Sequence, residues 1–237
     1  MSPKLIFYFY CSLLLFVGSQ ATYSEEEFDE NAIDYDDEID EREKFIDTIT
    51  ADYLEIIDYE VNQSKELFQN VLADSKISYA RSEILQGKKL ILENFIQYVN
   101  ERQERQMPPP SHRAALFFHV FGKSLIYKDF LGIVARLEPT QNRYDDMIED
   151  ALFANGIEDF LGTLREMRAS LIKKTIRKIE KYVDTLTASE RRKAAAQKLI
   201  DWAENMKNAP TLERKMEIFQ DCLRYEYLER KVPVVDF

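Results

Sequence analysis

From Arg42 onward, apolar residues recur every three or four positions along most of the chain, which is the period of an amphipathic α-helix. The first run of this kind predicts one long helix. Its apolar positions are Ile46, Ile49, Tyr53, Ile57, Val61, Phe68 and Leu72. Asp74 or Ser75 can then cap a second helix that continues to about Gln106. Three consecutive prolines follow and end it, because proline lacks the N–H donor.

The most apolar stretch beyond the first twenty residues covers 114–137. Charged side chains interrupt it before any uncharged run reaches the roughly 20 residues that span a bilayer. The pattern predicts two short helices that meet near Gly122, the first capped by Ser111 and the second stopped by Pro139. We expect these two helices to form the centre around which the others pack.

Two further helices are predicted over about 141–154 and 157–186. Asn155-Gly156 separates them, since both residues tolerate the positive φ of a helix end. In the longer helix, apolar residues keep three- and four-residue steps except for a gap at Arg168.

Two shorter helices complete the pattern. Thr187 and Glu190 have the spacing of a capping box, which predicts a helix that opens at Thr187, and a last helix restarts at Thr211. Strand-like alternation is absent outside residues 1–21, and Asn155-Gly156 is the one hairpin-type dipeptide. The sequence therefore predicts an all-α fold, an elongated bundle of about seven or eight helices over residues 42–237. A division near Pro108 into two smaller domains is the alternative.

Residues 1–21 have the layout of a secretory signal peptide. Lys4 precedes an apolar run over 5–17, and Ser19-Gln20-Ala21 supplies small residues for cleavage. We expect a secreted, extracellular protein that begins near Thr22 and does not span a membrane. An uncleaved anchor is the alternative.

Residues 22–41 form an acidic tail. Of the 43 acidic residues, eleven lie here, without one Lys or Arg, so we expect the segment to be disordered. Phe28, Ile33, Tyr35 and Ile39 interrupt the charge and could anchor on a partner protein that has a basic surface. This alternation resembles the tails with which leech and tick anticoagulants cover the basic exosite of thrombin. Tyr35, flanked by aspartates, is a candidate sulfation site, and a merely solvating tail is the alternative.

A basic stripe is predicted on the long helix, where Lys173, Arg177 and Lys181 repeat at four-residue spacing. It could bind an anionic polysaccharide, a phospholipid or the acidic tail itself. A solvated outer face is the alternative. The net charge of −11 argues against nucleic acid as a partner.

The motifs of catalysis are missing from the sequence. His112 and His119 are the only histidines, and no zinc, nucleophile-elbow or phosphate-loop motif occurs, so we predict no enzyme activity, no metal and no cofactor. We interpret His119 as a core residue, with a pH switch or a general base as the alternative. One acidic cluster resembles the magnesium motif of helical isoprenoid synthases, but no second metal motif follows it, so we interpret it as an acidic helix face. It consists of Asp145, Asp146, Glu149 and Asp150.

Two residues are candidates for covalent modification. Cys11 lies in the predicted signal peptide, which leaves Cys222 as a half-buried free thiol beside Phe219 and Leu223, or as the link of a disulfide-bonded homodimer. Asn62-Gln63-Ser64 fits the N-glycosylation rule and would carry a sugar if Asn62 faces solvent. Its neighbour Val61 points inward on the predicted helix, so we expect that Asn62 does not point inward.

The signal peptide, the acidic start, the long helices and the scarcity of cysteine together resemble the mosquito 34-kilodalton salivary family. That resemblance implies a non-enzymatic protein delivered to a host, where it could act on haemostasis or defence, or to the feeding apparatus. We therefore expect a secreted binding protein that engages an extracellular protein. The alternative is a carrier of a lipid or other apolar ligand beside an aromatic cluster. That cluster consists of Phe117, Phe118, Phe121, Tyr127 and Phe130.

Overall fold

The computed structural model describes residues 41–79, 81–104, 113–137 and 143–229. Over these ranges the chain forms eight α-helices and one π-helical turn, with no strand, so the all-α prediction is confirmed. The predicted signal peptide and almost all of the acidic tail lie outside the described residues. The helices are α2 (Glu41–Ala73), α3 (Ser75–Ser78), α4 (Glu83–Glu104), α5 (Arg113–Arg136), α6 (Arg143–Ala154), α7 (Ile157–Thr185), α8 (Ala194–Asn208) and α9 (Leu212–Arg224), followed by the π-helical turn η2 (Tyr225–Glu229).

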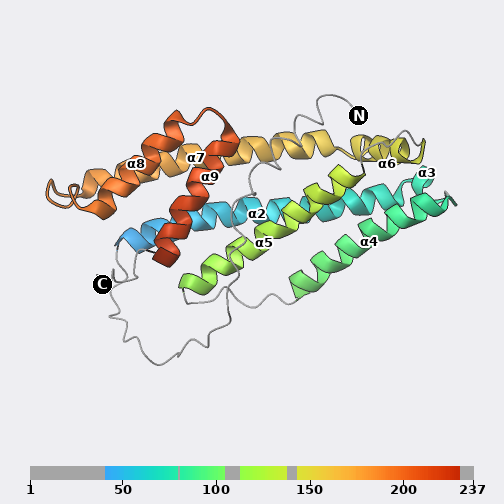
Figure 1. Cartoon of the computed structure of the whole chain (residues 1–237), viewed down its shortest axis with the longest axis horizontal. Helices are drawn as coiled ribbons and strands as arrows, with labels where there is room; N and C mark the ends of the chain where they lie inside the picture. Colours follow the sequence, from blue (N-terminus) through green and yellow to red (C-terminus); the bar gives the residue numbers. More distant parts are fainter. Residues whose placement is uncertain (1–40, 80, 105–112, 138–142, 230–237) are drawn as a thin grey trace, which may run out of the picture.

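The centre of the bundle is α2, and our prediction that 114–137 would occupy it was wrong. Helix α2 packs against α4, α5 and α7, and it lies between α7 and α5 in Figure 1. At 1.5 Å per residue its 33 residues extend about 50 Å, enough to contact partners along its whole length. The apolar residues of α5 are spread around that helix, so some of them face solvent. Phe118 is 57% exposed and Leu125 is 48% exposed.

Helix α5 is continuous through Gly122, whereas we predicted two helices that meet there. A glycine inside a helix costs about 1 kcal/mol of stability relative to alanine. The burial of apolar side chains on the neighbouring turns stabilises the helix by more than that. Val120 and Ile126 are buried on either side of Gly122. The helix ends at Arg136, close to the predicted stop.

The second predicted helix is divided into α3 and α4. Asp74 does act as a cap, because its carboxylate accepts a hydrogen bond from the Lys76 amide at 2.8 Å, but α3 is a single turn. Ile77 is fully buried, and the Lys89 ammonium donates to the Ser78 carbonyl at 3.1 Å, which ties α4 to this turn. These contacts stabilise the break between α3 and α4. The spacing of the apolar residues alone does not predict that break.

The corner between α6 and α7 is confirmed. Gly156 has a φ of 86°, in the left-handed region that favours glycine, and the Asn155 side chain donates to the Ala151 carbonyl at 2.7 Å. Helix α7 then runs over 29 residues, about 44 Å, beside α2. The two long helices make the bundle elongated.

The capping prediction at Thr187 was only partly right. The Thr187 amide donates to the Glu190 carboxylate at 2.8 Å, and the Glu190 amide donates to the Thr187 hydroxyl at 3.3 Å, as in a capping box. These residues form turns, however, and α8 begins only at Ala194. Thr211 caps α9 as predicted, accepting from the Arg214 amide at 3.2 Å.

Candidate functional site

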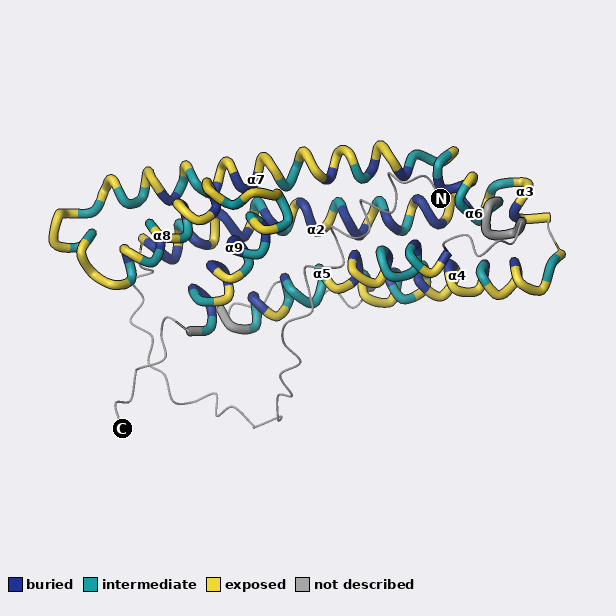
Figure 2. Tube along the Cα trace, turned by 45° about the horizontal axis from the view of Figure 1, so that its top comes forward, coloured by how far each residue is buried: buried dark blue, intermediate teal, exposed yellow. Residues whose placement is uncertain are grey.

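The predicted basic stripe lies on the solvent side of α7. Lys173, Arg177 and Lys181 are exposed, as is Lys174, and we call these four residues the α7 ridge. The outer edge of α7 is exposed along its length in Figure 2. From Lys173 to Lys181 the ridge extends about 12 Å. Within the described residues, none of its side chains has a hydrogen bond or an ion pair.

Other basic residues of α7 serve the fold instead. The Lys178 ammonium contacts the Asp52 carboxylate of α2 at 2.8 Å. The Arg168 guanidinium donates twice to the Glu60 carboxylate, at 3.1 and 2.7 Å. Both pairs join α7 to α2, so these two basic side chains serve the fold, whereas those of the ridge face solvent.

Acidic side chains at one end of the ridge are already neutralised. Glu180 pairs with the Lys207 ammonium of α8 at 2.6 Å, and Asp184 pairs with Arg191 at 3.6 Å. The ridge therefore keeps a local positive charge in a chain that is acidic as a whole.

Glu60 and Arg168 belong to a buried polar cluster that joins four helices. Glu60 is 3% exposed, and burial raises the pKa of its carboxyl while the Arg168 guanidinium opposes that shift. Arg168 also lies over the Tyr127 ring at 5.1 Å. The Tyr53 hydroxyl accepts from Gln220 of α9 at 2.9 Å, and burial raises its pKa to about 12. Because its groups are largely enclosed and paired with one another, this cluster joins α2, α5, α7 and α9 and stabilises the fold.

A second buried cluster joins the first turn of α2 to the π-helical turn η2. The Arg42 guanidinium donates to both Glu226 oxygens, one of them at 3.0 Å. The Tyr227 hydroxyl donates to the Asp47 carboxylate at 3.0 Å and lies 2.8 Å from the Thr50 hydroxyl. We call the Arg42–Glu226 pair the clasp, and it fixes the first turn of α2 against η2. The sequence pattern did not indicate this turn.

Cys222 is a free thiol, but it is fully buried rather than half-buried, at 2% exposed. Its predicted neighbours Phe219 and Leu223 are buried as well. Burial raises the pKa of the thiol, and the Glu226 carboxylate adds to that shift. A disulfide with a second chain would require the thiol to leave the core.

Among the described residues, no group of three or more His, Cys, Asp or Glu side chains is placed to hold a metal ion. The side chains of Asp145 and Asp146 lie outside the described part, as does His112. Glu149 is half-buried and Asp150 is exposed. His119 is half-buried on α5 rather than in the core, and burial and Lys123 lower its pKa.

The predicted glycosylation residue Asn62 is exposed, and its side-chain oxygen accepts from Gln103 of α4 at 2.8 Å. Val61 is buried, but successive residues of a helix point in different directions, so a buried Val61 does not bury Asn62. Ser64 of the same motif is fully buried and donates to the Glu60 carbonyl at 2.6 Å. A glycan on Asn62 stays a prediction. The tail residues Phe28, Ile33, Tyr35 and Ile39 lie outside the described residues, so partner binding and Tyr35 sulfation stay predictions too.

The aromatic cluster proposed to line a lipid cavity packs on itself. The rings of Phe117 and Phe121 are 4.2 Å apart, and those of Tyr127 and Phe130 are 5.9 Å apart. Phe130 also packs on Phe68 at 4.9 Å. These rings fill the space between α2 and α5 with their own side chains.

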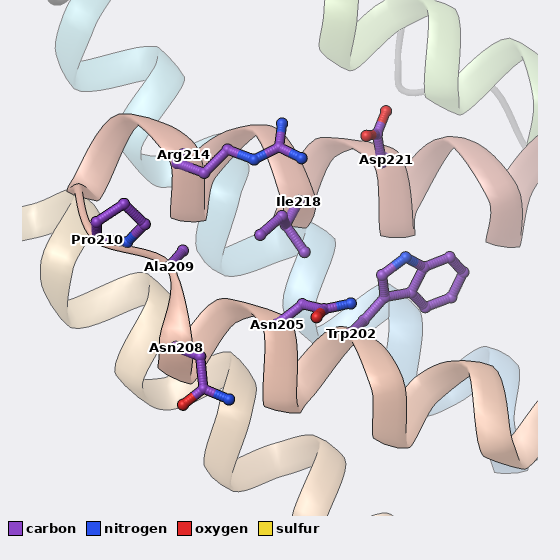
Figure 3. Close-up of a pocket in the computed structure, with 8 residues that line it drawn as sticks. All are labelled: Trp202, Asn205, Asn208, Ala209, Pro210, Arg214, Ile218 and Asp221. Atoms are coloured by element: carbon purple, nitrogen blue, oxygen red, sulfur yellow. The ribbon is translucent and has the colours of Figure 1, made fainter.

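A groove of about 420 Å³ lies between α8 and α9 (Figure 3). It is lined by Trp202, Asn205, Asn208, Ala209, Pro210, Arg214, Ile218 and Asp221. We missed this groove in the sequence. Its one local signal is the pair of amide side chains three residues apart on α8, but the facing helix α9 cannot be deduced from spacing.

No described helix has the length and apolar character needed to cross a membrane. Comparisons with family models, with characterised proteins and with solved structures found no match to this chain. The resemblance to the mosquito salivary family therefore stays a prediction.

Proposed function

We propose that this protein is a secreted, non-enzymatic binding protein whose α7 ridge binds a sulfated polysaccharide. The observation that carries the proposal is a line of four exposed basic side chains on one helix that have no partner among the residues the structure describes. A sulfated polysaccharide carries its negative charges along a chain, so successive sulfates could meet Lys173, Arg177 and Lys181 in order. The non-enzymatic role also agrees with what the family resemblance implies.

The surroundings of the ridge favour this partner over a lipid surface. A helix that binds a membrane surface inserts large apolar side chains beside its basic ones. Among the described residues, the exposed large apolar side chains lie on the α3 turn, α4 and α5 and not on α7. They are Tyr79, Ile84, Leu90, Ile91, Phe118 and Leu125. A purely electrostatic, linear surface suits a hydrated polyanion.

The test is retention of the secreted chain on immobilised heparin with elution by increasing chloride. Replacement of Lys173, Arg177 and Lys181 by Gln should weaken binding and reduce its dependence on salt, because exposed ion pairs are screened. The control removes the same charge from three exposed positions on other elements: Lys76, Arg81 and Arg136, each to Gln. The control should be retained like the parent. Equal losses in both variants, or no retention of the parent, would contradict the proposal.

A further inference from the structure

We propose that the groove between α8 and α9 is a binding site for a neutral saccharide. Polar side chains that no other part of the described fold uses gather there, and Asn205 and Asn208 are exposed to solvent. Among the described residues, the side-chain amides of Asn205 and Asn208 and the indole N–H of Trp202 have no hydrogen-bond partner. Asn205 and Asn208 come from one side of α8, three residues apart, and Figure 3 shows Asn205 between Asn208 and Trp202 along the groove.

The charges of the groove are balanced within α9. The Arg214 guanidinium pairs with Glu217 at 2.5 Å, and the Asp221 carboxylate pairs with Arg224 at 3.2 Å. The site therefore offers its ligand hydrogen-bonding groups but no unpaired charge. Such a groove favours an uncharged ligand. In this it differs from the α7 ridge, whose exposed positive charges favour an anionic ligand.

The shape and lining indicate a compact ligand with both polar and apolar faces. The turn at Ala209 and Pro210 lies at one end of the groove, and Ile218, 8% exposed, lies on its floor. A peptide in extended form would have to continue through that end. The volume of about 420 Å³ falls within the usual range of small-molecule sites, roughly 300–1,000 Å³.

A saccharide matches this combination of groups. A side-chain amide donates and accepts at once, so each Asn can bind two adjacent hydroxyl groups. The C–H faces of a sugar ring can pack on Ile218 and Pro210. Trp202 takes part in a cation–π contact. The Lys198 ammonium lies 5.4 Å from the centre of the Trp202 ring and 3.4 Å from the centre of the Tyr225 ring. The Tyr225 ring also packs edge-on against the indole at 5.2 Å, and these contacts favour one orientation of its N–H.

The experiment uses the fluorescence of Trp202, which is the only tryptophan in the chain. The full secreted protein is titrated with neutral monosaccharides and disaccharides, including glucose, galactose, mannose, N-acetylglucosamine and their β-linked disaccharides. We expect a saturable change in emission with at least one of them. Asn205→Leu should weaken that binding about 10-fold or more, because one residue that makes several hydrogen bonds is lost.

Asn70→Leu is the matched control, because Asn70 is an equally exposed helical asparagine on α2. It should leave the titration unchanged, and so should the Gln variant of the ridge, so this proposal and the proposed function can fail independently. Circular dichroism checks that each variant is folded. The proposal is overturned if no sugar gives a saturable change, if Asn205→Leu binds as well as the parent, or if a capped neutral peptide binds and the sugars do not.

Discussion

The buried charges and the α7 ridge use the same residue types in opposite ways. In the core, Arg42 and Arg168 each meet a carboxylate from a segment more than 100 positions away, Glu226 and Glu60. On the ridge, Lys173, Arg177 and Lys181 are exposed and meet no carboxylate within the described residues. Arg168 and Arg177 lie only nine positions apart on one helix. Position on the helix surface, and not residue type, therefore decides whether a basic side chain stabilises the fold or is available to a partner.

The largest effect is expected where both charges are fully enclosed. Arg42→Met takes the guanidinium away from the buried Glu226 carboxylate, and the side chains of this pair are 5% and 0% exposed. The free energy of unfolding should fall by roughly 3–5 kcal/mol. Urea denaturation followed by circular dichroism measures it. A loss below about 1 kcal/mol would show that the clasp is replaceable.

Arg168→Met should have the next largest effect. The Glu60 carboxylate would lose its guanidinium, but Arg168 keeps some contact with solvent, which lowers the expected loss to roughly 2–4 kcal/mol. The double variant Glu60→Leu with Arg168→Met should recover much of that loss, since no unpaired charge remains in the core. A double variant less stable than Arg168→Met would contradict this account.

Alkaline pH tests the burial of Cys222. The thiol of the unfolded chain loses its proton near its ordinary pKa of about 8.5, while burial keeps the folded thiol protonated. The unfolded state therefore binds fewer protons above that pH, and the free energy of unfolding should fall as pH rises, by at most about 1.4 kcal/mol per pH unit. Unfolding under reducing conditions between about pH 7.5 and 10 measures the slope. Cys222→Ala should be less steep, and parallel slopes would show that the thiol ionises equally in both states.

Lys178→Met tests the ion pair between Lys178 and Asp52. This pair is partly exposed, so it is intermediate between the buried ion pairs and the exposed ridge. Its side chains are 30% and 26% exposed, so the loss should be only about 0.2–1 kcal/mol. Thermal unfolding in low and high salt measures it, and the difference from the parent should shrink at high salt. A difference that does not depend on salt would assign the effect to packing of the lysine stem.

The smallest effect on stability is expected at the ridge. The three-residue Gln variant should lie within about 0.5 kcal/mol of the parent in urea denaturation, because exposed positions away from structural contacts tolerate substitution. The same variant is the one expected to lose heparin binding. A variant that loses both stability and binding would remove the distinction between the two groups of charges.

The sequence predicted the helices better than their arrangement. The three- and four-residue period located α2 and α7 almost to their ends, because each buries one continuous face. The prediction of the central helix was wrong because it relied on the high apolar content of residues 114–137. Apolar content does not tell how many sides of a helix are covered by other helices. The break between α3 and α4 depends on Ile77 and Lys89, which meet only after folding.

For the candidate sites, residue spacing identified a feature that lies on one helix, the α7 ridge. It missed the features that require two helices to meet, the buried ion pair and the groove. The ridge follows from four-residue spacing alone. The gap at Arg168 in the apolar pattern was a signal of a buried charge, but its partner Glu60 is 108 positions away and nothing local identifies it. The groove requires α8 and α9 to face each other, and that pairing is a property of the tertiary structure.

The clasp between Arg42 and Glu226 has a consequence for biosynthesis. A ribosome makes α2 first, but the glutamate that closes the clasp is 184 positions further along, so the bundle cannot be completed until nearly the whole chain has been synthesised. Helices α4, α5 and α7, which pack on α2, are synthesised before Glu226, so they can cover the buried face of α2, Ser64 included, before the clasp closes. The clasp is therefore among the last contacts of α2 that can form during synthesis.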